Sequence, residues 1–136
     1  MRKFIENTGF CLLIVTFLVV LVIFVSGFFG IQRYLVVSGS MEPNLYAGDI
    51  VFVNTNVNFE DVEIGDVIIF KHREMNIIHR VEDEALICGE KRLKTKGDNN
   101  KNADGYLATE DNFCGVAEYV IPKIGFLIDY KNLINK

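Results

Sequence analysis

An uncharged apolar run, "FCLLIVTFLVVLVIFVSGFF" at residues 10–29, constrains this chain more than any other feature. As an α-helix, a run of twenty residues spans about 30 Å, the thickness of the hydrocarbon core of a bilayer. The alternative is a cleaved secretory signal, because Arg2 and Lys3 precede the run and small residues stand at 26–27. Signal-peptide cores are shorter, about 7–15 residues. We therefore predict a retained transmembrane anchor at residues 10–30, after a cytoplasmic tail at 1–9.

The charges that flank the run predict its orientation. Arg2 and Lys3, offset by Glu6, lie on one side and Arg33 lies on the other. Basic residues favour the cytoplasmic side. We expect a single-pass protein of the cell membrane, with residues 31–136 forming a domain on the extracytoplasmic face, or on the lumenal face of the endoplasmic reticulum in a eukaryote. Residues 121–136 hold only a brief apolar run, so we expect no second span there.

The charge balance excludes several classes of partner. The chain holds 18 Asp and Glu against 14 Lys and Arg, and all but three of these charges follow the apolar run. An acidic domain argues against nucleic acid and against adhesion to anionic lipid headgroups, which both need a basic face. Contact with membrane lipid is expected through the anchor instead.

Three cysteines give no sign of a metal site. Cys11 lies in the apolar run, and Cys88 and Cys114 lack the spacing of metal ligands, so no metal is expected. An extracytoplasmic domain permits a disulfide between Cys88 and Cys114. Two buried thiols are the favoured alternative, since the sequence does not give the distance between them.

Short runs rich in Val, Ile, Phe and Tyr recur after residue 31, separated by turn residues, and no segment there has a long helical period. This pattern predicts one small, mostly β domain, with its sheet curled or packed around a small core. Two stretches, 54–63 and 96–105, are rich in turn residues and are predicted as irregular loops. The expected strands are residues 33–38, 49–54, 66–70, 76–81, 84–90 and 115–121.

The segment "SGSMEP", residues 38–43, follows closely on the apolar run. A serine hydroxyl is a weak nucleophile that needs a neighbouring base and donors aimed at the developing oxyanion. Gly39 allows a close backbone approach and Pro43 stiffens the exit, so the segment could present one hydroxyl on a rigid turn. Its composition alone favours a simple turn that joins the anchor to the domain.

Only two histidines are available as a base. His72 lies between Lys71 and Arg73, in what the sequence predicts to be a solvated turn. His79 would share one face of a strand with Ile77 and Val81, because side chains alternate along a strand. Partial burial keeps such an imidazole neutral and able to accept a proton, although a hydrogen-bonded core histidine fits the same pattern.

Two aspartates in the loop 96–105 could orient such a base. A third group that fixes the tautomer and the ring plane makes a general base effective. Asp98 and Asp104 both follow an expected strand. Aspartates in turns more often accept hydrogen bonds from their own backbone, and that alternative stays open for both.

Taken in order, "SGSMEP", Gly48-Asp49, "GDVIIF" at 65–70, His79-Arg80 and "TKGDNN" at 95–100 with Asp104 beyond resemble type I signal peptidase. The branch is the endoplasmic-reticulum type, which archaea and some spore-forming Gram-positive bacteria also carry. The resemblance extends from the apolar run to Gly125 and includes Gly115 and Pro122. It implies a largely antiparallel β domain close to the membrane.

The resemblance also implies roles. Ser40 matches the nucleophile, and Ser38 with the Ser40 backbone N–H matches the oxyanion hole. His79 stands where the common bacterial enzymes carry a lysine base. Asp104 matches an essential aspartate, and Asp98 a supporting position.

The implied substrates are secretory precursors with small residues at the last and third-last positions of the signal peptide. Neither a metal nor another cofactor is implied. Whether accessory subunits take part stays open.

Two alternatives remain at this point. The first is a serine–lysine peptidase in which Lys71 or Lys96 acts as the base. The second is a non-catalytic, membrane-anchored β module that binds an envelope partner. The intact set of Ser40, His79 and Asp104 argues against both.

Overall fold

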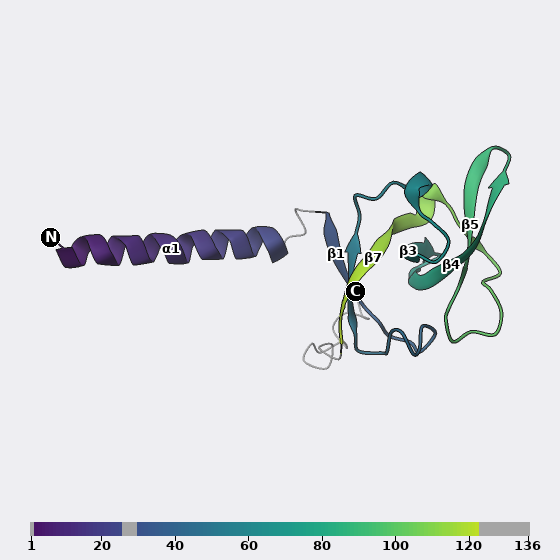
Figure 1. The fold of residues 1–136 in the computed structure, drawn as a ribbon, viewed down its shortest axis with the longest axis horizontal. Helices are drawn as coiled ribbons and strands as arrows, with labels where there is room; N and C mark the ends of the chain where they lie inside the picture. The colour runs from purple at the N-terminus through teal and green to yellow at the C-terminus, as the bar shows by residue number, and fades with distance from the viewer. Residues whose placement is uncertain (1, 26–29, 123–136) are drawn as a thin grey trace. The chain divides into compact units, whose positions relative to one another are not determined.

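The computed structural model describes residues 2–25 and 30–122, with side chains at 9–23 and 30–122 (Figure 1). The chain divides into two compact units, Met1–Ile31 and Gln32–Lys136. Residues 26–29 of the expected anchor lie outside the described residues, as do 123–136, which include Gly125 of the family resemblance and the brief apolar run near the end.

The first unit is the helix α1, Arg2–Val25. It begins eight residues before the predicted anchor, so most of the predicted tail is helical as well. Its apolar side chains are exposed; Phe10 and Phe17, for example, keep about two thirds of their surface. Within the part of the chain that the structure describes, no helix is both long and apolar enough to cross a membrane.

The second unit is an antiparallel sheet of seven strands that curls around its core (Figure 1). The mostly β fold is therefore confirmed. The strand order is β1-β2-β7-β3-β4-β5-β6. The strands are β1 (Ile31–Leu35), β2 (Ile50–Asn54), β3 (Val67–His72), β4 (Met75–Ile87), β5 (Glu90–Lys96), β6 (Leu107–Ala108) and β7 (Phe113–Ile121).

The prediction of one strand at 84–90 is wrong. β4 continues to Ile87, the chain turns at Cys88 and Gly89, and β5 begins at Glu90. Both turn residues have positive φ, 55° and 83°, which suits a tight hairpin turn. The sequence did not predict β5 because five of its seven residues are charged, and only Leu93 and Thr95 turn inward.

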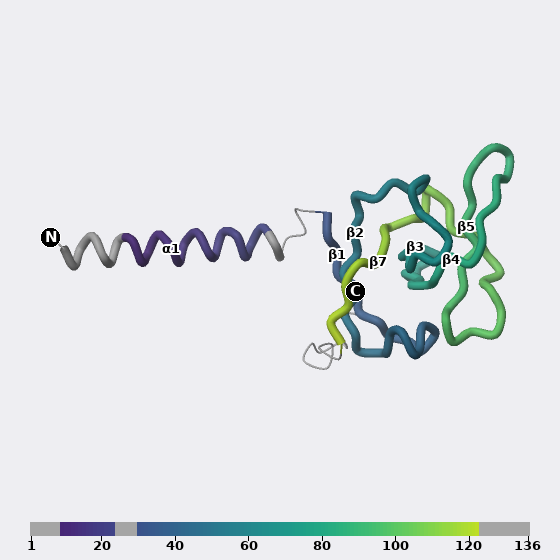
Figure 2. Tube along the Cα trace, viewed as in Figure 1, coloured from purple at the N-terminus to yellow at the C-terminus, as the bar shows by residue number. Residues whose placement is uncertain are grey.

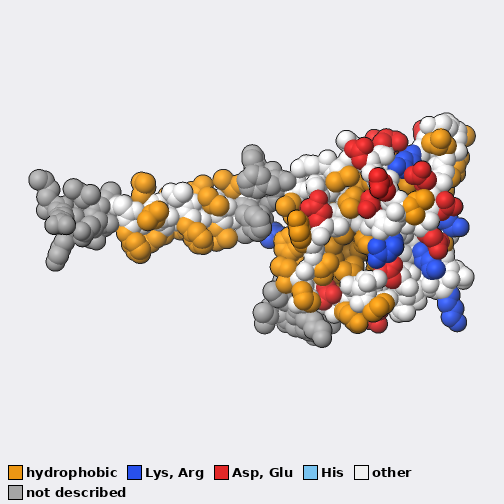
Figure 3. Space-filling view, in the orientation of Figure 1, with side chains coloured by type: hydrophobic (Ala, Val, Ile, Leu, Met, Phe, Trp, Pro, Cys, Tyr) orange, Lys and Arg blue, Asp and Glu red, His pale blue; other side chains and the backbone are white. Residues whose placement is uncertain are grey.

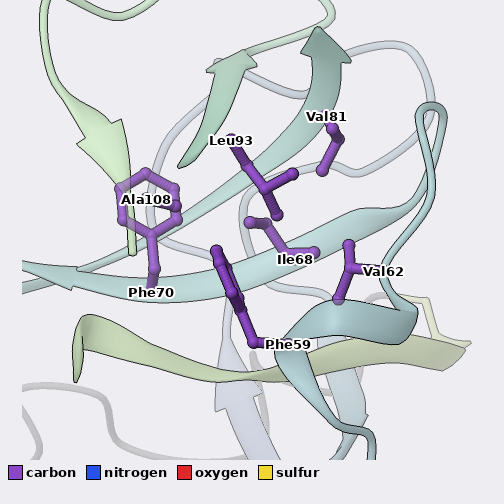
Figure 4. Close-up of a cluster of buried hydrophobic side chains, with 7 residues drawn as sticks. All are labelled: Phe59, Val62, Ile68, Phe70, Val81, Leu93 and Ala108. Carbon is purple, nitrogen blue, oxygen red and sulfur yellow. The ribbon is translucent and has the colours of Figure 1, made fainter. Parts of the chain in front are cut away.

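The core lies on both faces of the central strand β3. Ile68 and Phe70 point into one cluster and Ile69 into the other, as the alternation of a strand requires. Figure 4 shows the first cluster, formed by Phe59, Val62, Ile68, Phe70, Val81, Leu93 and Ala108. The second holds Val36, Met41, Leu45, Val51, Val53 and Ile69.

The stretch 54–63 is more ordered than predicted. It contains the 3-10 turn η1, Phe59–Asp61, and it supplies two core residues, Phe59 and Val62. Lys91 of β5 holds this segment, because its ammonium donates to the carbonyls of Glu60 and Val62 at 2.8 and 2.7 Å.

The surface of the second unit is chemically divided. In Figure 3, hydrophobic side chains gather over β1, β2 and β7, whereas acidic and basic side chains intersperse over β4 and β5. Val37, which follows β1, and Tyr119 of β7 are both 67% exposed. All three cysteines are free: Cys88 is exposed at the hairpin turn and Cys114 is half-buried, so the expectation of two buried thiols fails for Cys88.

Candidate active site

The segment after β1 forms a short turn that is fixed by its apolar residues. Met41, directly after Ser40, is 2% exposed, and Leu45 is 5% exposed; both lie in the second core cluster. The amides of Asn44 and Leu45 both donate to the Met41 carbonyl at 2.9 Å. Ser40 is half-buried and Ser38 is exposed, and their hydroxyl oxygens lie 3.2 Å apart. The segment is therefore a rigid turn and not a loose linker.

His79 lies on β4, opposite Ile68 of β3, and is 7% exposed. As predicted, it shares a strand face with Val81, which is buried, and Ile77, which packs against the same cluster. Its Nε2 atom is 3.2 Å from the Ser40 hydroxyl oxygen. The structure thus brings a nearly buried imidazole to the hydroxyl from a segment 39 residues away.

Asp104 occupies the other side of the imidazole. Its Oδ2 atom lies 2.6 Å from His79 Nδ1 and also accepts a hydrogen bond of 2.6 Å from the Thr95 hydroxyl. Because a carboxylate only accepts, the proton on the ring is assigned to Nδ1, which leaves Nε2 to accept from Ser40. The Asp104 amide donates to the Thr95 carbonyl at 2.8 Å. Thr95 is fully buried and was missed, because β5 was not predicted.

Asp98 makes no hydrogen bond in the series that joins Ser40, His79 and Asp104. Arg80 holds it with two hydrogen bonds, from Nε at 2.9 Å and from Nη2 at 2.8 Å, and Asn44 Nδ2 donates to it at 2.7 Å. The hydrogen bonds from Arg80 are the largest cause that lowers the pKa of Asp98. Partial burial opposes this effect, and the bond from Asn44 lowers the pKa further. The pKa of Arg80 is raised by the same hydrogen bonds. Asp98 therefore joins the loop to β4 and to Asn44.

The loop after β5 lies beside the serine turn, residues 38–45 (Figure 2), and hydrogen bonds join the two. The Asn99 amide donates to the Ser40 carbonyl at 2.8 Å, and Asn99 Nδ2 donates to the Gly39 carbonyl at 3.1 Å. A Cβ atom on Gly97 would lie 2.6 Å from the Ser40 carbonyl oxygen and 2.9 Å from His79 Nε2. Gly97, Asn99 and Asn44 were not singled out from the sequence, because only the pairing of distant segments gives them these contacts.

A cleft of about 290 Å³ opens beside the Ser40 hydroxyl. Its lining includes residues 35–38, residues 76–79 of β4 and Tyr106. β5 pairs with β4 only from Arg80 onward, so it does not cover the edge of β4 at Met75–His79.

His72 does not lie in a solvated turn, contrary to the prediction. It ends β3, is half-buried, and stacks on Tyr106, with ring centroids 3.8 Å apart. Burial, and secondarily the charge of Asp104, raise the pKa of Tyr106. His72 therefore supports a wall of the cleft and is not the histidine that faces Ser40.

The remaining candidate bases lie elsewhere. Lys96 Nζ is 3.5 Å from a carboxylate oxygen of Glu82, and Lys71 is exposed. Among the described residues, no group of three or more His, Cys, Asp or Glu is placed to hold a metal ion. The arrangement that remains is a hydroxyl, an imidazole and a carboxylate in series, which can activate an oxygen nucleophile.

Comparison with known proteins identifies the family of the chain. Residues 9–101 match the family described as signal peptidase, peptidase S26. The chain belongs to this family. The match includes the serine turn, β4 and the loop that carries Asp98 and Asn99, and it ends just before Asp104.

Three curated relatives of this chain carry the name "Signal peptidase complex catalytic subunit SEC11". They come from Komagataella phaffii (35% identical), Colletotrichum graminicola (34%) and Lachancea thermotolerans (37%), and each comparison covers 68% of this chain. The matched part spans 59 to 61% of the length of these relatives. The chain is thus similar to part of each relative.

Proposed function

We propose that this chain is a membrane-anchored serine endopeptidase that removes signal peptides from secretory precursors, with Ser40 as the nucleophile. One observation carries the proposal: Ser40 Oγ, His79 and Asp104 are joined in series at 3.2 and 2.6 Å. That order, hydroxyl to Nε2 and Nδ1 to carboxylate, is the one that nucleophilic acyl transfer needs. The family membership supports the choice of substrate.

In the proposed acylation step, the Ser40 oxygen attacks the carbonyl carbon of the scissile bond while His79 Nε2 takes the hydroxyl proton. The carbonyl electron pair moves onto its oxygen, which Ser38 Oγ–H and the Ser40 N–H stabilise. Each such donor contributes about 3–4 kcal/mol in the transition state. Protonated His79 then gives its proton to the leaving amine as the C–N bond breaks, and Asp104 stabilises the imidazolium in between.

Water completes the cycle. His79 removes a proton from a water molecule that attacks the acyl-enzyme, and the second tetrahedral intermediate collapses as the Ser40 oxygen leaves with that proton. The products are the free carboxyl end of the signal peptide and the mature protein with a new amino terminus. The hydrogen bond from Thr95 helps to keep Asp104 in the orientation that His79 requires.

The cleft supports an extended peptide as the substrate. The edge of β4 at Met75–His79 that faces it offers backbone hydrogen-bonding groups, so a substrate strand can add there. The cleft of about 290 Å³ has apolar residues in its lining, Val36, Ile77 and Tyr106 among others. Discrimination by such apolar pockets rests on shape, which suits substrates with small residues at the last and third-last positions.

The apolar run at residues 10–29 supports the membrane anchor in this proposal. The second unit would then lie on the extracytoplasmic face of the cell membrane, or on the lumenal face of the endoplasmic reticulum in a eukaryote. Ser40 follows the run by about ten residues, an extended reach of at most about 33–36 Å. The hydroxyl would therefore stay near the bilayer surface, where the cleavage site of a signal peptide emerges. Confinement of both reactants to one layer raises their effective concentration.

Accessory subunits belong to the proposal as well. The curated relatives are named as catalytic subunits of a signal peptidase complex, and this chain shares part of their length. Activity of the purified chain alone, compared with activity in membranes from which it was taken, tests whether it needs such subunits.

The test of the proposed function is cleavage of a secretory precursor by the detergent-solubilised chain. We expect Ser40→Ala, His79→Ala and Asp104→Asn each to lose at least about 10³-fold in kcat. The matched control is His72→Phe, which removes the other histidine, keeps an aromatic ring against Tyr106 and should keep most of the activity. Full activity of Ser40→Ala would disprove the proposal, and full activity of His79→Ala would show that the base is another residue.

The same set of variants tests the alternatives. A serine–lysine peptidase requires that Lys71→Ala or Lys96→Ala abolish cleavage while His79→Ala does not. A non-catalytic module requires that the wild type cleave no precursor and that no covalent serine probe react with Ser40.

A further inference from the structure

The loop 97–100 lies against the backbone of the serine turn, and its contacts go to two successive carbonyls. Asn99 donates to both: its backbone amide to the Ser40 oxygen at 2.8 Å, and its side-chain amide to the Gly39 oxygen at 3.1 Å. These bonds join segments 60 residues apart in the sequence. They hold the backbone that carries Ser40, and they leave its hydroxyl untouched.

The bond to Gly39 has a geometric consequence. The only cis peptide among the described residues is Glu42-Pro43, so the unit between Gly39 and Ser40 is trans and planar. In a trans unit the carbonyl and the following N–H point in opposite directions. Since the Gly39 carbonyl points at Asn99, the Ser40 N–H points away from the loop. Asn99 therefore sets the direction of the amide that the proposed function assigns to the oxyanion.

The loop itself is fixed from two sides. Arg80, next to His79 on β4, binds Asp98 through two nitrogens, and Asn44, from the serine turn, donates to the same carboxylate. The Asn100 amide donates to the Gly97 carbonyl at 2.9 Å and closes the loop. Asn99 is thus held by its neighbours, although its own side chain is exposed.

We propose that Asn99 is a positioning residue, which orients the Ser40 N–H toward the oxyanion by holding the Gly39 carbonyl. This inference rests on the proposed function, because it concerns the transition state of that reaction. The side chain touches neither the substrate nor the reacting atoms. Its effect should appear in kcat and leave KM nearly unchanged, because the oxyanion forms only in the transition state.

Asn99→Asp tests this proposal, because it keeps the size of the side chain and removes the donor. We expect kcat for precursor cleavage to fall by about 10- to 100-fold, less than the loss of a whole oxyanion donor, with KM within about twofold. Asn99→Ser, which keeps a hydroxyl donor, should recover part of the loss. The matched control is Asn102→Asp, a change of the same chemistry and charge at an exposed position two residues after the loop 97–100.

A second readout is the rate at which a fluorophosphonate probe labels Ser40, since this reaction also builds charge on an oxygen but needs no signal peptide. We expect the rate to fall in Asn99→Asp and not in Asn102→Asp, with the thermal midpoints of both variants close to the wild type.

The outcomes separate the two proposals. A wild type that cleaves or is labelled, with Asn99→Asp equal to it in that reaction, overturns the role of Asn99 alone. A wild type that is labelled but cleaves no precursor overturns the proposed function, and the labelling rates then decide the role of Asn99. A Ser40 that neither cleaves nor reacts overturns both.

Discussion

The two halves of β4 have different environments, although they are one continuous strand. The inner half, Met75–Val81, pairs with β3 as far as Arg80 and carries His79, Arg80 and buried Val81. The outer half, residues 82–87, forms a hairpin with β5, and every one of its residues is exposed. Reactive side chains thus lie where core packing and hydrogen bonds limit their rotamers, while the exposed side chains at residues 82–87 are free of such packing.

Two glycines outside β4, Gly97 beside His79 and Gly89 in the turn after the outer half, give the largest expected contrast. A Cβ on Gly97 would lie 2.6 Å from the Ser40 carbonyl oxygen, a backbone atom that cannot move without moving the nucleophile. We expect Gly97→Ala to lower kcat/KM by about 100-fold or more, since a displacement of about 1 Å has effects of that size. The measurement is precursor cleavage.

Gly89→Ala, in the hairpin turn, is the control for this change. Gly89 has a φ of +83° but open space around its Cβ position. The substitution should lower the free energy of unfolding by about 1 kcal/mol, because an L-residue is strained at such a φ, and it should leave cleavage unchanged. Equal activity of the two variants would remove the distinction between the two regions.

Two apolar residues of β4 give the second contrast, in stability. Val81 is 1% exposed and Leu86 is 78% exposed. We expect Val81→Ala to lower the free energy of unfolding by about 1.5–3 kcal/mol, because it removes buried methyl groups and leaves a cavity. Leu86→Ala deletes more atoms but should change the same free energy by less than about 0.5 kcal/mol. Urea denaturation measures both, and a larger loss in Leu86→Ala would mean that the outer half packs against something further.

The sequence predicted the inner half of β4 well and the outer half poorly. The alternation of "NIIHRV" places His79 on the face of Val81, and this follows from the period of a strand alone. "EALICGEKRLK" alternates weakly and is highly charged, so neither the turn at Cys88 and Gly89 nor the strand β5 was predicted. A strand segment that exposes both faces, as residues 82–87 do, lacks the hydrophobic pattern on which such predictions depend.

The candidate site also contains residues that the sequence predicted and residues that it did not. Ser40, His79 and Asp104 were chosen through their order in a family resemblance, and the structure brings them within hydrogen-bonding distance. Thr95 and Asn99 could not be chosen, since a buried threonine and an exposed asparagine have no pattern of their own. Their roles come from segments that are distant in the sequence, and only the fold brings these together.

The ion pairs of the two regions give the smallest contrast, in the dependence of stability on pH. Arg80 lowers the pKa of Asp98, chiefly through its hydrogen bonds to that carboxylate. A carboxyl group with a lowered folded-state pKa stabilises the fold above its unfolded pKa, about 3.9, and this stability is lost as pH falls through the folded value. The difference in unfolding free energy between wild type and Asp98→Asn should therefore be constant near neutral pH and shrink below about pH 4.

Glu84→Gln, in the hairpin, removes a carboxylate that is half exposed and 3.5 Å from Lys91, so its effect should be near zero at pH 7. Urea titrations at pH 7, 4 and 3 measure both differences, and a difference for Asp98→Asn that grows toward low pH would contradict the lowered pKa.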